Sequence, residues 1–128
     1  MAQQEINLNE EMKFAVLLSI IDLGGSAKKS DVLSNLVTKG YIYVDYGNYF
    51  QTRSNGETVW ENDLAWERKH LVDLGCVDNS AFGVWTITEK GKLLFIKLYY
   101  EKMQNTAFNF LDAPATNRAK QLIQTLNF

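Results

Sequence analysis

The sequence predicts a mostly helical α+β fold, namely a winged helix-turn-helix with additional C-terminal helices. Three observations lead to this prediction. Two helical patterns come first, separated by a short Gly-Gly-Ser-Ala turn at residues 24–27, as at the opening of a helix-turn-helix. A third helical pattern stops at Gly75 and is followed by two strand-like runs, which is the pattern of a hairpin wing. Further helical patterns follow from residue 89.

The first helix is expected from Glu10 to Leu23, with Asn9 as its cap and the glycine pair at 24–25 as its stop. A short second helix is expected over residues 28–39, and Gly40 ends it. The apolar residues of the first helix recur at helical spacing, so they predict one buried stripe made of Phe14, Leu17, Leu18 and Ile21.

The segment from Tyr41 to Glu57 is expected to form an ordered loop, because it combines turn signals with many aromatic residues. These aromatic residues have two interpretations. Either they cover the edge of the core, or they form a contact surface for nucleic-acid bases or a protein partner, since exposed tyrosine suits both.

The third helix is expected to begin at Thr58, where Thr-Val-Trp-Glu forms a capping box, and to end at Gly75. Two short strands then follow, joined by a turn around residues 79–83. Trp85 on the second strand is predicted to anchor the wing in the core. The inward face of the third helix is predicted to consist of Trp60, Leu64, Leu71 and either Leu74 or Val72.

Two more helices are expected after the wing. Thr88 is predicted to cap a fourth helix over residues 89–105, whose apolar residues spread over a wide arc. Such a helix is usually sandwiched between neighbours. A fifth helix is expected from Asn117 to Leu126. We therefore expect a winged-helix domain over residues 1–105 and a helical extension over 106–128 that packs on it or mediates association.

Composition excludes several classes of function. Fifteen acidic and thirteen basic residues give a net charge of −2, whereas a dedicated nucleic-acid binder usually has a basic excess or a clustered basic face. The single cysteine, Cys76, rules out an internal disulfide, and together with one histidine it leaves no plausible ligand set for zinc. No metal, cofactor or small-molecule substrate is expected.

The N-terminal stretch MAQQEINLNEE is acidic and polar, which is unlike a signal peptide. The longest apolar run, Phe14–Ile21, is too short to span a bilayer. With a lone cysteine, these features predict a reducing, cytoplasmic setting without a membrane partner.

The stretch WENDLAWERKHLVDLGCVDNSAFGVWTITEKG, residues 60–91, resembles the N-terminal winged-helix domain of Mrr-type modification-dependent restriction endonucleases. That family combines a helix of the form aromatic-x-Asn-Arg-x-x-Trp-Ala with Leu-x-x-Ala-Gly, a Gly-x-Trp wing and Thr-x-x-Gly. The likeness extends over residues 10–95, and it implies a DNA-binding targeting module that recognises methylated DNA. The matching positions are Trp60, Asn62, Trp66, Leu71, Gly75, Gly83, Trp85, Thr88 and Gly91.

The sequence departs from the family pattern in its charges. Asp63 stands where the family has Arg, and Glu67 where it has Ala. Residues 58–88 contain two basic and five acidic side chains, for a local charge of −3. Lys and Arg strengthen DNA binding by releasing counterions from the phosphates, and each acid opposes this gain. Ordinary docking of the third helix on DNA is therefore weakened.

Asn62 is the preferred base-reading candidate, because Asn can pair with the N6 and N7 edge of adenine. An aromatic side chain suits contact with a methyl group, so Trp60 and Phe82 are candidates for methyl contact or base stacking, and the loop from Tyr41 to Phe50 offers further aromatic residues. The candidate DNA contacts around them, on the third helix, before it, at the start of the second helix and on the wing, are Arg68, Lys69, Arg53, Ser54, Asn55, Lys28, Lys29, Asn79 and Ser80.

No catalytic constellation is evident. Residues 11–13 and 67–69 have the Glu-x-Lys spacing of a Mrr-type nuclease site, but they lie on predicted helices instead of adjacent strands. There is no phosphate-binding glycine loop and no nucleophile with a base and an orienting partner. We predict that this chain is not an enzyme, which leaves open a nuclease domain in a longer protein.

Three interpretations of function remain open. In the first, the partner is double-stranded DNA, bound by the third helix and the wing. In the second, this is a protein-interaction winged helix or a small dimeric transcription regulator, with a homodimer or a fused nuclease domain as partner. In the third, nucleic acid contacts the C-terminal helices, since residues 89–128 contain three acids against six bases, namely Lys90, Lys92, Lys97, Lys102, Arg118 and Lys120.

Overall fold

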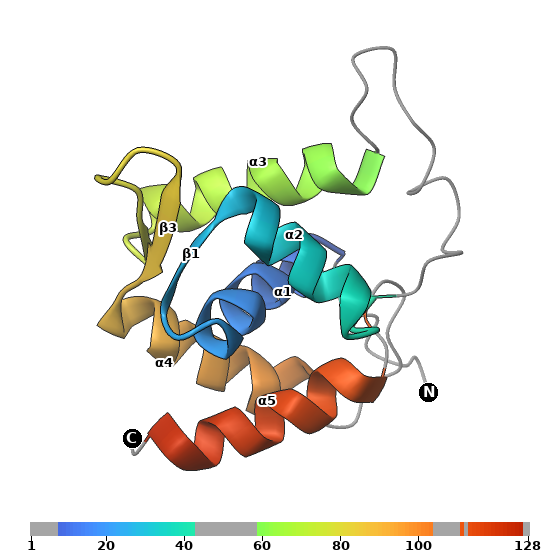
Figure 1. Ribbon diagram of the computed structural model, residues 1–128. Helices are drawn as coiled ribbons and strands as arrows, with labels where there is room; N and C mark the ends of the chain where they lie inside the picture. Colours follow the sequence, from blue (N-terminus) through green and yellow to red (C-terminus); the bar gives the residue numbers. More distant parts are fainter. Residues whose placement is uncertain (1–7, 43–58, 104–110, 112, 127–128) are drawn as a thin grey trace.

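A computed structural model of the 128-residue chain describes residues 8–42, 59–103, 111 and 113–126. The expected loop over residues 43–57, the Thr58 cap and the candidates Arg53, Ser54 and Asn55 lie outside the described residues. The elements, drawn in Figure 1, are α1 (Leu8–Asp22), β1 (Ser26–Lys28), α2 (Lys29–Thr38), α3 (Val59–Asp73), β2 (Val77–Asp78), β3 (Val84–Ile87), α4 (Glu89–Leu98), the π-helix η1 (Tyr99–Met103) and α5 (Ala113–Leu126).

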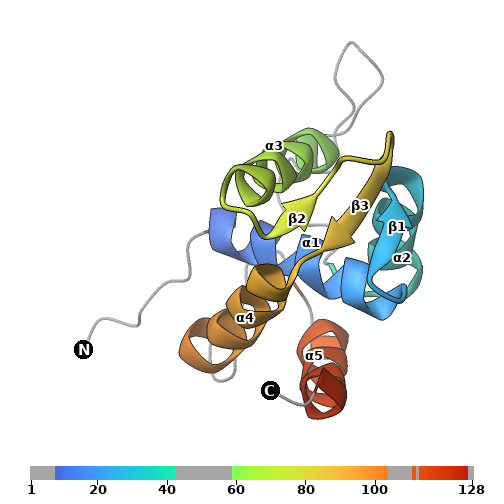
Figure 2. The same ribbon diagram turned by 90° about the vertical axis from the view of Figure 1, so that its left-hand side faces the viewer.

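The three strands form one antiparallel sheet in the order β1-β3-β2. Figure 2 shows this sheet in front of α1, with α3 and α2 on its two sides and α4 and α5 below. A helix, a strand, two helices and a hairpin in this succession make a winged helix-turn-helix, so the predicted fold class is confirmed. The helices beyond the wing, α4 and α5, are the predicted additions.

Helix α1 is the centre of the core. Its residues from Phe14 to Leu18 are all fully buried, so the prediction of a single buried stripe is wrong. A helix that is apolar on all sides is surrounded by its neighbours, and α1 contacts α2, α3, α4 and α5. The ring of Phe14 stacks on Phe95 of α4 at a centroid distance of 4.9 Å. Asn9 is not the cap, because the helix already begins at Leu8.

The turn after α1 is shorter than predicted. Gly24 and Gly25 have φ values of 100° and 102°, a backbone region that favours glycine, and they end the helix. Ser26–Lys28 is then not part of the turn but forms β1, which pairs with β3. This strand has only three residues and no β-branched side chain, so its own propensity gives no signal. The pairing with β3 creates it.

The wing and the start of α4 form as predicted. Thr88 caps α4: its Oγ1 accepts a hydrogen bond from the Gly91 amide at 3.1 Å and donates one to the Gly75 carbonyl at 2.7 Å. The Cys76 backbone approaches α4 so closely that position 91 requires glycine, because a Cβ atom there would lie 2.2 Å from the Cys76 carbonyl oxygen. The α-helix ends at Leu98 and continues as η1, earlier than predicted.

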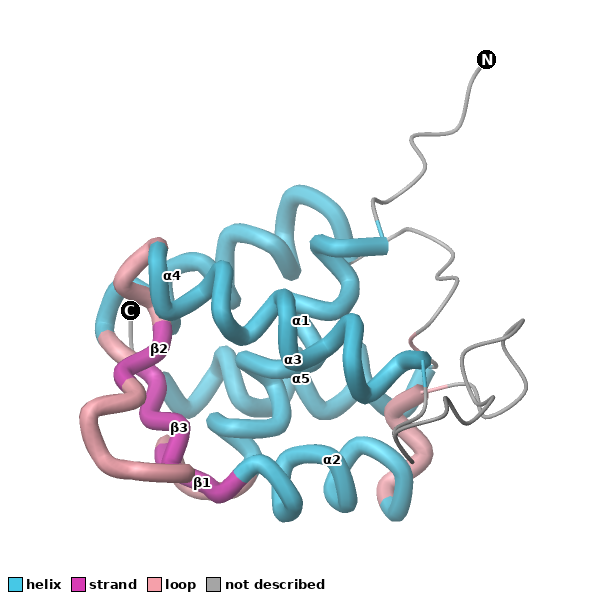
Figure 3. The backbone as a smooth tube through the Cα atoms, turned by 90° about the horizontal axis from the view of Figure 1, so that it is seen from above, coloured by secondary structure: helices cyan, strands magenta, loops and turns pink. Residues whose placement is uncertain are grey.

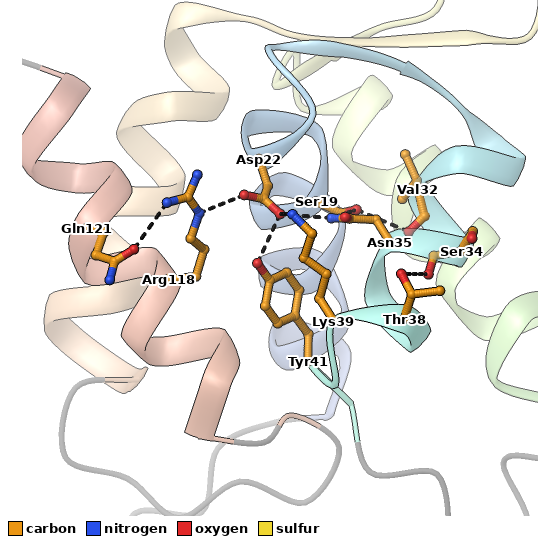
Figure 4. Close-up of polar contacts among 10 residues, drawn as sticks. All are labelled: Ser19, Asp22, Val32, Ser34, Asn35, Thr38, Lys39, Tyr41, Arg118 and Gln121. Atoms are coloured by element: carbon orange, nitrogen blue, oxygen red, sulfur yellow. Dashed lines mark hydrogen bonds and ion pairs between the residues drawn. The ribbon is translucent and has the colours of Figure 1, made fainter.

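Asp22, at the end of α1, joins three helices through its buried carboxylate (Figure 4). Its Oδ2 accepts hydrogen bonds from Asn35 Nδ2 of α2 at 3.0 Å and from the Tyr41 hydroxyl at 2.9 Å. Lys39 Nζ lies 3.2 Å from the same oxygen, and Arg118 Nε of α5 donates to Oδ1 at 2.7 Å. Burial raises the pKa of this carboxyl, but the four hydrogen bonds outweigh burial and lower it to about 2.

Helix α5 begins at Ala113, four residues before the predicted start at Asn117. Pro114 lies in its first turn, where a missing amide donor is tolerated. The helix buries Ala115, Ala119 and Leu122 and packs against α1.

Candidate nucleic-acid interface

Helix α3 presents an outer face that points away from the core. Trp60, Leu64 and Leu71 are buried, as predicted, and they define the inner face. Of the two alternatives for its last position, Val72 packs partly buried against the core, whereas Leu74 is exposed beyond the end of α3. The helical repeat of 3.6 residues places Asn62, Trp66, Lys69 and Asp73 on the opposite side. We call these four residues the outer face of α3. Trp66 is 54% exposed, and Lys69 and Asp73 are exposed, whereas Asn62 is half-buried.

Trp66 and Lys69 form a unit on this face. The Lys69 ammonium lies 5.3 Å from the centroid of the Trp66 ring, within the range of a cation–π contact. The contact fixes a positive charge beside an exposed aromatic plane. Such a pair suits an anionic partner that also offers apolar or aromatic surface.

Glu67 does not face outward, contrary to the expectation that the third helix is acidic on its DNA-facing side. Only 4% of Glu67 is exposed, and its Oε1 lies 2.8 Å from Lys13 Nζ of α1 and 3.2 Å from His70 Nδ1. The acid is therefore compensated inside the protein. Of the charges that opposed DNA docking, this one is removed from the surface.

Arg68 points to the wing side of α3 and is half-buried. Its guanidinium lies 5.2 Å from the centroid of the Trp85 ring on β3, and Trp85 is only 4% exposed, as predicted for a core anchor. The Arg68 Nε atom is buried and has no hydrogen-bond partner among the described residues. Arg68 therefore packs α3 against the wing strand, a placement unlike that of a free phosphate contact.

The wing turn is held by a local side-chain contact. The Asp78 carboxylate accepts a hydrogen bond from the Ser80 amide at 2.8 Å, which is the geometry of an Asx turn and lowers the pKa of Asp78. Gly83 has a φ of 72° and closes the turn before β3. Asn79 and Ser80 are exposed, and Phe82 is fully exposed at 103%.

The start of α2 contributes two basic residues. Lys28 ends β1 and is exposed, while Lys29 opens α2 and is half-buried. Figures 1 and 3 show the β1–α2 junction and the wing loop at the same end of the molecule, beside the C-terminal half of α3. Asn62, by contrast, lies in the first turn of α3, the end of the helix that points away from the wing in Figure 1. Of the predicted regions, the start of α2 and the wing therefore lie at one end of the molecule.

A family profile described as the Mrr N-terminal domain matches residues 10–96, which span α1 to most of α4. The chain belongs to this family. The match confirms the resemblance read from residues 60–91, and it links the chain with Mrr-type restriction systems as an N-terminal domain and not as the nuclease domain. Neither curated proteins nor solved structures give a significant match.

In this Mrr N-terminal domain the two tryptophans of α3 have opposite roles. Trp60 was a candidate for base stacking, but it is 2% exposed and belongs to the core, so it is unavailable for stacking. Trp66 matches the family pattern as well, and it is exposed. The signal that distinguishes them is their spacing, because six residues correspond to 600° and place Trp66 well away from the inner face.

The two Glu-x-Lys matches are structural in this Mrr N-terminal domain. Both lie on helices, as predicted, and both carboxylates are buried. Glu11 accepts a hydrogen bond from the Leu111 amide at 3.3 Å, and Glu67 pairs with Lys13. Among the described residues no three His, Cys, Asp or Glu side chains gather as metal ligands. None of the described helices combines the length and apolarity needed to cross a membrane.

Proposed function

We propose that this chain is a DNA-binding module that targets a Mrr-type restriction system to duplex DNA through the outer face of α3. The observation that carries the proposal is the arrangement of that face. Asn62, Trp66 and the stacked Lys69 point away from the core, and the acid between them, Glu67, is turned inward and neutralised by Lys13. Asp73 is then the one acid among the four residues of this face.

The major groove of DNA is wide enough to admit an α-helix, and recognition helices of this fold class enter it. With α3 in the groove, Asn62 reads adenine through its N6 and N7 edge. Lys69, together with Lys28 and Lys29 at the start of α2, contacts phosphates and fixes the register. The wing lies beside the groove, where Asn79 and Ser80 offer further hydrogen bonds to the backbone.

Recognition of a methyl mark is the finer part of the proposal. A methyl group in the major groove is a small apolar target, and side chains contact such groups through apolar surface. Trp66 and Phe82 are the exposed aromatic residues on α3 and the wing. We assign methyl contact to Trp66, in place of the buried Trp60, and keep Phe82 as a second aromatic contact at the wing tip.

In this proposal the chain has no catalytic role, and DNA cleavage belongs to a different domain. Two features also weaken the alternative interpretations. The acidic third helix was expected to suit a basic protein partner, yet one of its acids, Glu67, faces α1, while Asp73 stays exposed on the outer face. Among the bases of the C-terminal helices, Arg118 is held by Asp22. Both observations favour the outer face of α3 as the DNA-binding surface.

The test is fluorescence anisotropy with labelled duplexes, unmodified or carrying methyladenine or methylcytosine, at low and physiological salt. Lys69→Ala is expected to weaken binding to all duplexes and to lower the salt slope by about 0.9, because one phosphate contact is lost. Asn62→Ala is expected to weaken binding to adenine-containing sites by about tenfold or more.

Lys120→Ala on α5 is the matched control, since it removes an exposed lysine far along the chain from α3. The affinity of this variant for the duplexes is expected to equal that of the wild type. Trp66→Ala is expected to abolish any preference for methylated duplexes while leaving weaker general binding. Equal affinity for methylated and unmodified DNA would remove the methyl assignment alone. Flat anisotropy traces at low salt would refute DNA binding as a whole.

A further inference from the structure

An apolar groove lies between the end of α3 and α4. Its volume is about 270 Å³, and its lining consists of Leu74, Cys76, Lys90, Leu93, Leu94 and Lys97. Figure 2 shows the end of α3, β2 and α4 on this side of the molecule. The groove is distinct from the outer face of α3, with which it shares no residue.

The four α4 residues of the groove follow the spacing i, i+3, i+4, i+7, so they form one stripe along the helix. A lysine stands at each end of the stripe and two leucines stand between them. The buried face of α4 is a different one, formed by Gly91, Phe95 and Leu98.

The sequence predicts that α4 is sandwiched between neighbours, because its apolar residues cover a wide arc. The described residues cover its buried face and part of Leu94 but leave Lys90, Leu93 and Lys97 of the stripe exposed. Leu93 is 55% exposed, and Leu74 on the other wall is 47% exposed. These two leucines give the groove apolar walls that stay in contact with water.

The charges around the groove select the chemistry of its occupant. Lys92 pairs with Glu89, but neither Lys90 nor Lys97 pairs with any described residue. The groove therefore has an apolar floor with an uncompensated positive charge at both ends. A phosphate backbone matches the lysines but not the floor, and a small apolar molecule matches only the floor.

A second copy of the chain fits this groove poorly. In a two-fold dimer the same patch meets itself, so Lys90 and Lys97 of both copies would face one another in an apolar contact. Like charges across an interface cost binding free energy. The volume also lies below the roughly 300–1,000 Å³ of typical small-molecule sites.

We propose that this groove binds an acidic amphipathic helix of a protein partner. Apolar side chains at helical spacing on that helix fill the space between Leu74 and Leu93, and its carboxylates pair with Lys90 and Lys97. This is the helix-in-groove mode of recognition, in which apolar anchors supply affinity and flanking charges supply orientation.

The experiment is a selection of random helical peptides displayed on phage against the full chain, with counter-selection on the Leu93→Asp variant. Enriched peptides are expected to carry apolar residues at helical spacing, flanked by Asp or Glu. Their synthetic versions are expected to bind Leu93→Asp at least about tenfold more weakly, because the burial of one leucine is lost.

The double variant Lys90→Glu/Lys97→Glu provides a second test that keeps the apolar floor. This variant is expected not to bind the selected peptides, but to bind versions of them in which the acidic residues are replaced by lysine. Lys92→Glu is the matched control on the same helix, and circular dichroism checks that each variant is folded. Enrichment of basic or uncharged peptides, or no enrichment over Leu93→Asp, would overturn the proposal. Self-association in sedimentation equilibrium that Leu93→Asp abolishes would overturn it in favour of a second copy.

Discussion

Replacing Asp22 with asparagine is expected to destabilise the fold in a pH-dependent way. The Asp22 carboxylate accepts hydrogen bonds from α2, from Tyr41 and Lys39 after it, and from Arg118 of α5. These bonds hold its pKa at about 2, compared with an ordinary value of 3.8. The difference between the two pKa values corresponds to about 2 kcal/mol of folding free energy.

The sign follows from the direction of the shift. The pKa in the folded state is depressed, so the stabilisation is fully present above the unfolded pKa of 3.8 and is lost as the pH falls toward 2. At neutral pH the free energy of unfolding of the wild type is expected to exceed that of Asp22→Asn by at least about 2 kcal/mol. Below pH 4 this excess is expected to shrink.

Urea unfolding, followed by tryptophan fluorescence at about pH 7, 4 and 2.5, measures this difference directly. Other carboxylates titrate in both proteins, so the comparison isolates Asp22. Asp73→Asn is the control for losing an exposed carboxylate, and it is expected to change the free energy of unfolding by less than about 0.5 kcal/mol at neutral pH. If the wild type and Asp22→Asn lose stability in parallel between pH 4 and 2.5, the ionised Asp22 carboxylate does not have this stabilising role.

Three further substitutions test other features. Thr88→Ala removes both hydrogen bonds of the Thr88 hydroxyl and is expected to cost about 1–2 kcal/mol in urea unfolding, whereas Thr116→Ala, at a half-buried position of α5 with one local hydrogen bond, is expected to cost less. Gly91→Ala places a Cβ atom 2.2 Å from the Cys76 carbonyl oxygen and is expected to cost about 3 kcal/mol or more; a melting temperature equal to that of the wild type contradicts the close approach. Phe82→Ser removes a fully exposed side chain, so thermal melting is expected to be unchanged while anisotropy shows weaker DNA binding. A marked loss of stability in this last variant means that Phe82 packs in the fold.

The parts of the fold that local chemistry determines are predictable from the sequence. Gly75, Thr88 and the wing turn carry their signals within a few residues, and they form as predicted. β1 carries no such signal, because a three-residue strand exists only through its pairing with β3. The all-round burial of α1 likewise depends on helices distant in the sequence, and no single-helix pattern reveals how many neighbours surround it.

The candidate site is predictable as a region and less so as a set of side chains. Asn62 and Lys69 lie on the outer face, in agreement with their helical positions. To predict which of Trp60 and Trp66 is exposed, one must compare their angular positions around the helix with that of the inner face. The burial of Glu67 could not be predicted from α3 alone, since it depends on Lys13, which approaches its carboxylate from α1. Charge counted along the sequence therefore overstated the negative charge of the surface.

The bond between Asp22 and Arg118 bears on where the folding unit ends. The family match stops at residue 96, but α5, beyond it, closes one side of α1 and supplies a partner for a buried carboxylate. A fragment cut at the edge of the match leaves Asp22 without its guanidinium and exposes core atoms of α1 to water. We therefore expect that a fragment must extend through α5 to preserve the fold, so that the family match covers less of the chain than the structure needs for its stability.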